Sequence, residues 1–260
     1  MIGFCHLYTI VSSQPSVHLK KTYYLIAHRG GVVDSTITDN SRTSIEAAIK
    51  RGYNMVEVDL RLTKDSILII QHDPTFKRYY GLDKPVSSMT WDQTSQLRSS
   101  IGGDRVLRFE DVLKICKGRI QIMIDNKIRG MDSGIFTRVI SLVRHYGLLD
   151  QALMIGTTAS TPFFTGRIKL SCTRKQLEIN MKQPGYSPAN YYIFEIPGNI
   201  SARDVKWAKA NDIQIVAAIN KFRYYHSSDP LKDAREDINR MRNEGVTHFQ
   251  IDSEFDASFH

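Results

Sequence analysis

Short apolar segments alternate with helical patterns along almost the whole chain. Residues 23–28 and 55–62 are such apolar segments, and between them, after residue 41, apolar side chains recur at helical spacing. Strands that are separated by helices pair in parallel through right-handed crossovers. The pattern predicts an α/β protein, and at 260 residues it favours a (β/α)8 TIM barrel. A doubly wound open sheet is the alternative.

The number of strand candidates exceeds what a barrel needs by one. The nine candidates are residues 23–28, 55–62, 66–73, 119–127, 152–156, 167–172, 191–196, 213–219 and 246–252. A turn at Lys64 and Asp65 joins the second candidate to the third without a helix between them. We expect the third candidate to be a barrel strand, and either 167–172 or 191–196 to be the extra segment.

The alternation of strand and helix patterns is interrupted at residues 76–108, which predicts a small insertion with one short helix after the third strand. We expect a single domain of residues 23–260. Residues 1–13 are fairly apolar, but this stretch is too short to span a bilayer and no basic region precedes it. We expect an N-terminal extension that packs on the barrel. The cytoplasm is the default location; a signal peptide trimmed upstream would instead place the protein in the periplasm or outside the cell.

Composition excludes several classes of protein. Hydrophobic residues make up 42% and charged residues 24%, as in a globular protein with a full core. Three widely spaced cysteines give neither a disulfide framework nor a zinc site, and they favour a reducing compartment. The net charge is +8, but the basic residues are scattered, so we expect no nucleic-acid partner and no stable membrane insertion. A positive field would help to collect a phosphate-bearing small molecule.

Titratable side chains gather at the ends of the first four predicted strands. They are His28, Arg29, Glu57, Asp59, His72, Asp125 and Lys127. In a parallel barrel the carboxyl ends of all strands meet on one face, where active sites lie. We therefore expect these groups to converge there.

Three of these residues are carboxylates. Glu57 and Asp59 are two apart on a strand, so their side chains point the same way, and inside a barrel they would repel each other unless a cation joined them. Asp125 could supply a third oxygen ligand. Oxygen ligands without a thiolate select Mg²⁺ or Ca²⁺ over zinc. The alternative is a solvent-facing pair in which Asp59 contacts Arg61.

The two histidines fit a general acid and base, because the ordinary pKa of imidazole lies near neutrality. The alternative for each of His28 and His72 is a structural hydrogen bond at a strand end. Arg29 offers a fork of donors that suits a phosphate group, and Lys127 offers a point charge. The glycines at residues 30 and 31 either let backbone amides approach an anion or form a turn.

The ordered motifs resemble one family. The segments AHRGG, DNSRTSIEAAI and GYNMVEVDLRLTKDSILIIQHDPT are similar to the glycerophosphodiester phosphodiesterase family, which shows HRG, EN, E-x-D, HD and later E-x-K. The match is strong over residues 25–75 and looser through residue 127. The C-terminal half matches mainly in its alternation of strands and helices.

The resemblance implies a TIM barrel, one divalent cation, and hydrolysis of glycerophosphodiesters to glycerol 3-phosphate and an alcohol. It implies the following roles by position: His28 and His72 catalytic, Glu57, Asp59 and Asp125 metal ligands, and Arg29, Asn40 and Lys127 substrate or phosphate ligands. The sequence departs from the family pattern at Asp39 and Asp125, where the family has glutamate. Two alternatives remain open: a lyase or phospholipase D-like enzyme on the same barrel that acts on lysophospholipid or sphingomyelin, and a catalytically idle barrel that binds phosphodiesters.

Overall fold

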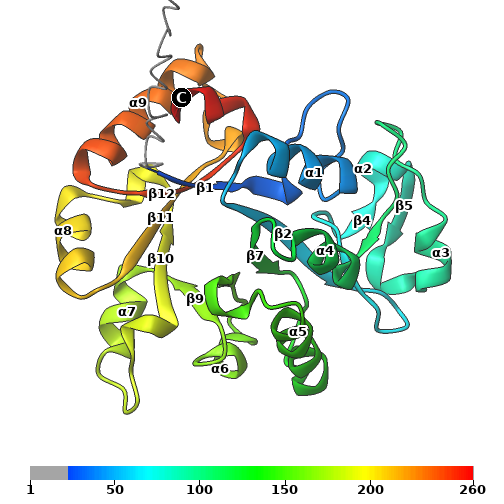
Figure 1. The fold of residues 1–260 in the computed structure, drawn as a ribbon, viewed down its shortest axis with the longest axis horizontal. Coiled ribbons are helices and arrows are strands. Elements are labelled where there is room, and N and C mark those ends of the chain that lie inside the picture. Colours follow the sequence, from blue (N-terminus) through cyan, green and yellow to red (C-terminus); the bar gives the residue numbers. More distant parts are fainter. Residues whose placement is uncertain (1–22, 260) are drawn as a thin grey trace, which may run out of the picture.

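Eight parallel strands close into a barrel in the computed structural model, which describes residues 23–259 (Figure 1). The strands are β1 (Tyr24–Ala27), β2 (Met55–Leu62), β7 (Gln121–Asn126), β8 (Leu153–Ile155), β9 (Lys169–Cys172), β10 (Tyr191–Glu195), β11 (Gln214–Ile219) and β12 (His248–Ile251). Strand β1 pairs with both β12 and β2, which closes the ring. The predicted (β/α)8 barrel is confirmed. The expected N-terminal extension lies outside the described residues.

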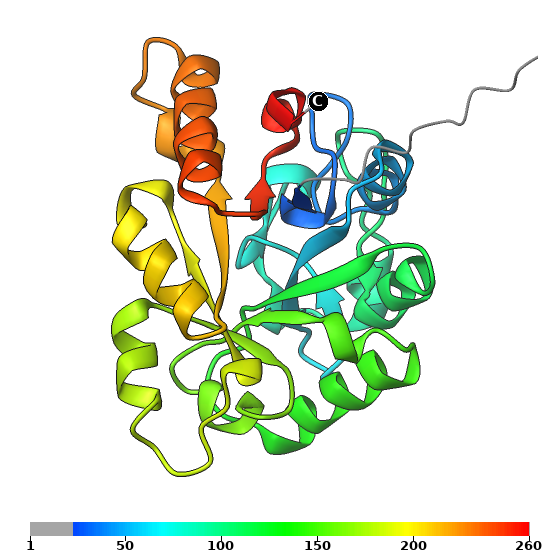
Figure 2. The ribbon, with the colours of Figure 1, turned by 60° about the vertical axis from the view of Figure 1, so that its left-hand side comes forward.

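Helices surround this ring, as Figure 1 shows. They are α1 (Arg42–Arg51), α4 (Phe109–Cys116), α5 (Ser133–His145), α6 (Thr161–Phe164), α7 (Arg174–Asn180), α8 (Ala202–Ala210) and α9 (Pro230–Glu244). Short 3-10 turns are η1 (His28–Gly30), η2 (Val86–Ser88), η3 (Leu149–Gln151), η4 (Pro188–Asn190), η5 (Pro197–Asn199), η6 (Lys221–Tyr224) and η7 (Ser253–Phe259). The parallel strands β11 and β12 point to the same end of the barrel in Figure 2.

The third strand candidate is not part of the barrel, which corrects the prediction. Strand β3 (Leu68–Ile70) pairs with β2 in antiparallel orientation, and both 167–172 and 191–196 contribute barrel strands. The physical reason is the connection of residues 63–67, since a parallel partner needs a crossover of about a dozen residues or more.

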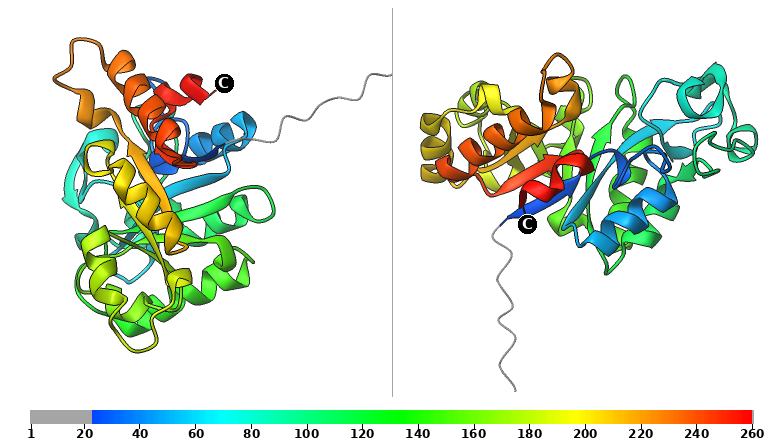
Figure 3. Two further views of the ribbon diagram at one scale, coloured as in Figure 1. Left: turned by 90° about the vertical axis from the view of Figure 1, so that its left-hand side faces the viewer. Right: turned by 90° about the horizontal axis from the view of Figure 1, so that it is seen from above.

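Strand β3 begins a segment that lies to one side of the barrel (Figure 3). This segment continues with β4 (Thr75–Phe76), α2 (Lys77–Tyr80), β5 (Leu82–Pro85), α3 (Trp91–Ser95) and β6 (Leu107–Arg108). Strand β6 returns to pair with β3, and β4 pairs with β5. The chain then enters α4 and rejoins the barrel at β7.

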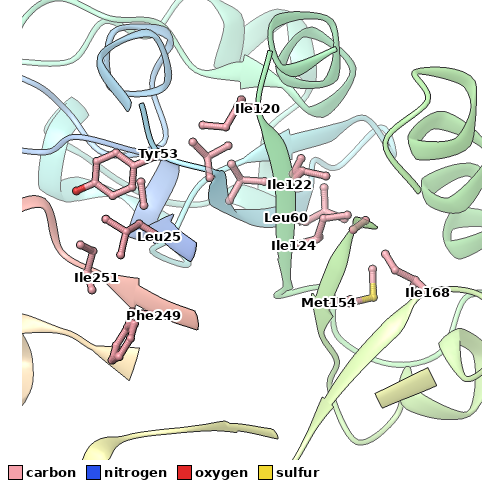
Figure 4. Close-up of a cluster of buried hydrophobic side chains, with 14 of the residues drawn as sticks. Leu25, Tyr53, Leu60, Ile120, Ile122, Ile124, Met154, Ile168, Phe249 and Ile251 are labelled. Atoms are coloured by element: carbon pink, nitrogen blue, oxygen red, sulfur yellow. The ribbon is translucent and has the colours of Figure 1, made fainter. Parts of the chain in front are cut away.

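Alternate residues of each strand face the helices and the barrel interior. On β2, Val56, Val58 and Leu60 belong to the large core beneath the helices, of which Figure 4 shows several members. The neighbouring Met55 instead packs with side chains from five other barrel strands, and such a group can only form inside the ring. Glu57 follows Met55 on the inward face, so the strand period places Glu57 and Asp59 inside the barrel.

The two glycines after β1 allow a close approach to α1. A Cβ atom on Gly31, whose φ is 135°, would lie 2.1 Å from the carbonyl oxygen of Ser44. The amide of Gly31 also donates to the carbonyl of His28 at 3.2 Å, so this stretch is a turn. Ser41 caps α1 by accepting from the amide of Ser44. Together these contacts fix where His28 and Arg29 leave the barrel.

Candidate active site

Three carboxylates meet inside the barrel at the carboxyl ends of β2 and β7. The parallel register places Asp59 opposite Asp125, and ligand oxygens of Glu57, Asp59 and Asp125 lie within 4.8 Å of one another. Glu57 and Asp59 are each only 1% exposed, so the alternative of a solvent-facing pair does not hold. Arg61 donates instead to the carbonyl of His72.

Burial disfavours the ionised form of these carboxylates. It raises the pKa of Glu57 well above its ordinary value, and the nearby Asp59 and Asp125 raise it further. Burial also raises the pKa of Asp125. The Oε2 atom of Glu57 accepts from the amide of Arg29 at 2.8 Å, but its Oε1 atom is buried without a hydrogen-bond partner. A buried orphan oxygen beside two further carboxylates is a donor set that fits a hard divalent cation.

Two side chains hold Asp59 in place. The Nδ2 atom of Asn40 donates to Asp59 Oδ2 at 2.8 Å, and the amide of Asp59 donates to Asn40 Oδ1 at 3.1 Å. Lys127 Nζ lies 3.4 Å from Asp59 Oδ1 and donates to Asp125. Burial opposes the charge on Lys127, but Asp125 and Asp59 outweigh it and raise the pKa of this amine. The amide nitrogen of Asn40 carries a second hydrogen, so its bond to Asp59 does not exclude the predicted contact with a substrate.

His28 is held by a residue that follows β12, the strand that pairs with β1. Its Nδ1 atom lies 2.7 Å from Asp252 Oδ1, and because a carboxylate only accepts, Nδ1 donates. The amide of Lys221 donates to the other oxygen of Asp252 at 2.6 Å. The Nε2 atom of His28 lies 4.0 Å from Glu57 Oε2, so it faces the acidic cluster.

His72 reaches the same region by a different route from the predicted one. It follows the antiparallel strand β3 rather than a barrel strand. Its Nδ1 atom lies 2.8 Å from Asp73 Oδ1, and its Nε2 atom lies 3.2 Å from Arg29 Nη2. Arg78 donates to both oxygens of Asp73. Each histidine thus has a carboxylate at Nδ1 and presents Nε2 toward the site.

Asp39 forms ion pairs with two arginines, Arg78 and Arg29. It is 3% exposed, and its Oδ2 atom lies 2.9 Å from Arg78 Nη2 and 3.7 Å from Arg29 Nη1. Burial raises the pKa of Asp39, while Arg78 and Arg29 oppose that rise. The departure from the family glutamate at this position therefore lies beside Arg29 and not among the three clustered carboxylates.

Sequence reasoning missed Asp252, Asn220 and Arg78. The side chain of Asn220 lies 3.1 Å from His28 Nδ1. Both Asp252 and Asn220 directly follow a barrel strand, which is the signal that was used for the first four strands and was not extended to the last two. Arg78 lies in the inserted segment, where no regular pattern indicates a direction.

The cavity beside this site is small. It has a volume of about 60 Å³ and is lined by residues that include His28, Arg29 and Asp252. A much larger cavity, about 860 Å³, lies at the opposite end of the strands, beside Gln214 and Val246. The chemistry and this larger cavity therefore lie at different ends of the barrel.

The fold and the site together define a class of protein. Two imidazole–carboxylate pairs, an arginine and three clustered carboxylates, two of which are buried, stand at the carboxyl face of a parallel α/β barrel, where barrel enzymes bind their substrates. The model of the Glycerophosphoryl diester phosphodiesterase family matches residues 28–138. The matched part carries both histidines and all three carboxylates, so the chain resembles this family where its candidate site lies.

Individual relatives with similar sequences carry related names. The putative glycerophosphodiester phosphodiesterase YhdW of Bacillus subtilis is 27% identical over 129 residues, which are 47% of this chain and 52% of the relative. The human lysophospholipase D GDPD3 is 24% identical over 132 residues, 46% of this chain and 40% of the relative. The chain thus matches about half the length of these curated relatives.

Solved structures show the same fold. A glycerophosphoryl diester phosphodiesterase from Parabacteroides distasonis superposes with a TM-score of 0.74 at 18% identity, over 92% of this chain and 86% of that one. A phosphodiesterase from Oleispira antarctica, in complex with the product sn-glycerol-3-phosphate, has a TM-score of 0.69 at 15% identity, over 90% and 95%. None of the helices within residues 23–259 has the length and apolar character needed to cross a membrane.

Proposed function

We propose that this protein is a metal-dependent phosphodiesterase that hydrolyses glycerophosphodiesters to glycerol 3-phosphate and an alcohol. The observation that carries the proposal is the convergence of three carboxylates, of which two are buried and one has an orphan oxygen, and two histidines whose Nδ1 atoms are held by other carboxylates. The match to the family model over residues 28–138 and the product complex of the structurally similar Oleispira protein support it.

Glu57, Asp59 and Asp125 would hold the cation, and their oxygen donors suit Mg²⁺ or Ca²⁺. When bound, a divalent cation neutralises charge on a phosphate oxygen as the transition state forms. Asn40 keeps Asp59 oriented for this role, and Lys127 balances part of the negative charge from the other side. The shorter Asp125 still brings its carboxylate to the cluster, because its strand pairs directly with β2.

Arg29 would bind the phosphate group, and the two histidines would transfer protons. The guanidinium of Arg29 stands beside His72 Nε2 and offers planar donors to a phosphate group. One histidine takes a proton from the nucleophile at Nε2, and the other gives a proton to the leaving alkoxide. The nucleophile is water or a neighbouring hydroxyl of the substrate. The second route needs a vicinal diol, so it makes bis(p-nitrophenyl) phosphate a poor substrate.

The test is the release of glycerol 3-phosphate from a panel of glycerophosphodiesters. We expect turnover that EDTA abolishes and that Mg²⁺ or Ca²⁺ restores. His28→Ala and His72→Ala should each lower the rate by about 10²–10⁴-fold while the protein remains folded. The exposed His226 provides the matched control, since it lies outside the site.

Three results would contradict the proposal. Full activity in the presence of chelator would show that the reaction needs no cation. Full activity of either histidine variant would show that this histidine has no part in catalysis. Phosphorus NMR of the products separates hydrolysis to glycerol 3-phosphate from a lyase reaction, which would leave a cyclic phosphate, and from a phospholipase D-like cleavage of lysophospholipid.

A further inference from the structure

Five side chains at the catalytic face form a closed ring of contacts. His72 Nδ1 lies 2.8 Å from Asp73 Oδ1, and Arg78 donates to both oxygens of Asp73. Arg78 Nη2 also lies 2.9 Å from Asp39 Oδ2, which in turn lies 3.7 Å from Arg29 Nη1. The ring closes where Arg29 Nη2 lies 3.2 Å from His72 Nε2. Arg78 therefore joins the carboxylate partner of His72 to the carboxylate partner of Arg29.

Contacts on several sides fix the guanidinium of Arg78, which lies in α2. Its Nε atom donates to Asp73 Oδ2 at 2.8 Å and its Nη2 atom donates to Oδ1 at 3.1 Å, and two such bonds fix the plane of the carboxylate. The guanidinium carbon lies 4.5 Å from the ring centre of Tyr79, whose hydroxyl donates to Asp39 Oδ2 at 3.4 Å. Partial burial opposes the charge on Arg78, but Asp39 and Asp73 outweigh it and raise the pKa of the guanidinium. The side chain is therefore charged and held in one orientation.

The ring also determines which nitrogen of His72 carries the proton. A guanidinium only donates, so Nε2 accepts from Arg29, and Nδ1 holds the proton that it donates to Asp73. Burial alone would raise the pKa of Asp73, but the hydrogen bond from His72 and the charge of Arg78 lower it, so this acceptor stays ionised. Arg78 thus keeps Asp73 in the state and orientation that leave the lone pair of Nε2 facing the site.

The other side of the ring concerns Arg29, which offers donors to a phosphate group. Asp39 is 3% exposed, and its carboxylate pairs with both Arg78 and Arg29. If Arg78 were removed, Arg29 would be the cation left beside this carboxylate in the described part of the chain, and a buried charge that loses its partner is costly. Arg29 would then be drawn toward Asp39 and away from His72 and the phosphate.

We infer that Arg78 is a positioning residue of this site, which orients His72 through Asp73 and keeps Arg29 available to the phosphate through Asp39. The inference rests on the proposed function and assigns the inserted segment a part in it, since α2 lies outside the eight barrel strands. A residue that only stabilised the inserted segment would change neither the affinity for phosphate nor the position of the proton on His72.

The first experiment compares Arg78→Met with Lys77→Met in the hydrolysis of glycerophosphodiesters. Both variants remove one positive charge from α2, but Lys77 is exposed and pairs with Asp83 at 3.0 Å, outside the site. We expect Arg78→Met to raise KM about tenfold and to lower kcat by about 10–10²-fold, because a phosphate ligand and a proton-transfer group are both displaced. Lys77→Met should stay within about twofold of the wild type in both constants.

The pH–rate profile of Arg78→Met should also move to higher pH. The charged groups that act on His72 are Asp73, Arg29, Asp39 and Asp125. The variant leaves all four in place and removes the cation that Asp73 and Asp39 share, so both carboxylates favour a protonated imidazole more strongly. A merely structural role of Arg78 would lower activity without moving the profile.

Arg78→Lys separates charge from geometry. A lysine keeps the positive charge but replaces the planar fork with a point charge. We expect KM to return to within about threefold of the wild type and kcat to stay about tenfold low. Thermal unfolding shows which variants are folded at the assay temperature, and if Arg78→Met is not, the low kcat of Arg78→Lys carries the test.

The position of the proton on His72 can be measured without any substrate. Nitrogen-15 NMR at pH 8, above the ordinary pKa of imidazole, distinguishes the two neutral tautomers, and the spectrum of His72→Ala assigns the signal. We expect the proton on Nδ1 in the wild type and in Lys77→Met, and a mixture of the two tautomers in Arg78→Met.

Two results would overturn the inference and leave the proposed function intact. One is a folded Arg78→Met protein with unchanged KM and an unshifted pH–rate profile, and the other is the same His72 tautomer in this variant and in the wild type. A wild-type protein that hydrolyses no glycerophosphodiester would instead contradict the proposed function, and the NMR comparison would then decide the inference by itself.

Discussion

The two ends of the barrel both bury ionisable groups, but they do so in opposite ways. At the carboxyl end, Glu57, Asp59 and Asp125 are held against one another. At the amino end, Lys169 donates to Gln214 Oε1 at 3.0 Å, and His248 lies 2.9 Å from the hydroxyl of Thr247 and 4.9 Å from the ring of Tyr24.

The difference lies in what each end can do about its charge. Burial lowers the pKa of His248 to about 4 and also lowers the pKa of Lys169, so the histidine is uncharged at neutral pH and needs no counter-ion. The carboxyl end keeps three acids together and leaves an oxygen of Glu57 without a partner. Like charges that the fold holds together mark a functional site better than cavity size does, because the larger of the two cavities lies at the amino end.

Among the variants that compare the two ends of the barrel, the largest effect is expected for Glu57→Gln. The amide preserves the shape and can still accept from the amide of Arg29, but it removes one anionic ligand, so activity should fall by about 10²–10³-fold. A buried acid whose pKa is raised stabilises the fold least when it is ionised. The metal-free wild type should therefore lose stability as pH rises above the ordinary glutamate value, and the variant should lose less.

Thermal unfolding at pH 5 and pH 8, with and without EDTA, measures this second effect. Glu178→Gln on α7 is the control, since Glu178 is an exposed residue paired with Arg174. The contrary result is a Glu57→Gln protein that has wild-type activity and whose stability depends on pH as in the wild type. The two ends of the barrel would then differ in composition only.

The next effect concerns the contact that closes the site. Burial alone would raise the pKa of Asp252, but the hydrogen bond from His28 and its other contacts lower it, so this carboxylate stays ionised at neutral pH. Asp252→Asn should reduce kcat by about 10–10²-fold, a part of what one acid–base group contributes, and should shift the pH–rate profile. Asp256→Asn is the control, because Asp256 in η7 pairs with Arg51 instead. An unshifted profile would show that Asp252 only supports the loop.

The residues that sequence reasoning could and could not place differ in a physical way. Four of the site residues, His28, Glu57, Asp59 and Asp125, lie at or near the ends of barrel strands that follow one another in the sequence. The alternation of residues along each strand and the order of the strands are therefore enough to predict that they lie close together. Asp252 is 224 residues from His28, and their contact exists only because β12 pairs with β1 when the ring closes. Strand periodicity shows which side chains face inward, but it does not show which strands become neighbours.

Orientation and length caused the other errors. The alternation in residues 66–73 is the same for a parallel and an antiparallel strand, and only the short connection of residues 63–67 distinguishes them. Helices α6 and α7 have four and seven residues, too few for a helical period to stand out. The sequence still predicts that His72 lies near the three carboxylates, because His72 reaches them whether its strand is parallel or antiparallel.

At the amino end we expect a stability effect that depends on pH. A histidine whose folded pKa is depressed to about 4 adds stability above its unfolded value of about 6.5, and that contribution is lost as pH falls toward 4. The full difference is about 3 kcal/mol. His248→Gln should remove this part of the pH dependence and leave activity at pH 7 within about twofold. Urea unfolding at pH 7 and pH 4.5 checks it; equal pH dependence in both proteins would be the contrary result.

The smallest effect is expected for Lys169→Met. The thioether keeps the apolar length of the stem and removes an amine whose charge burial already disfavours, while Gln214, its partner, is partly exposed and can turn to water. The unfolding free energy should change by less than about 1 kcal/mol, and kcat/KM by less than about twofold. Lys169 also lines the cavity of about 860 Å³, so this variant tests that cavity directly. A tenfold loss of activity without loss of stability would place part of the substrate at the amino end, and the contrast between the two ends would no longer locate the chemistry.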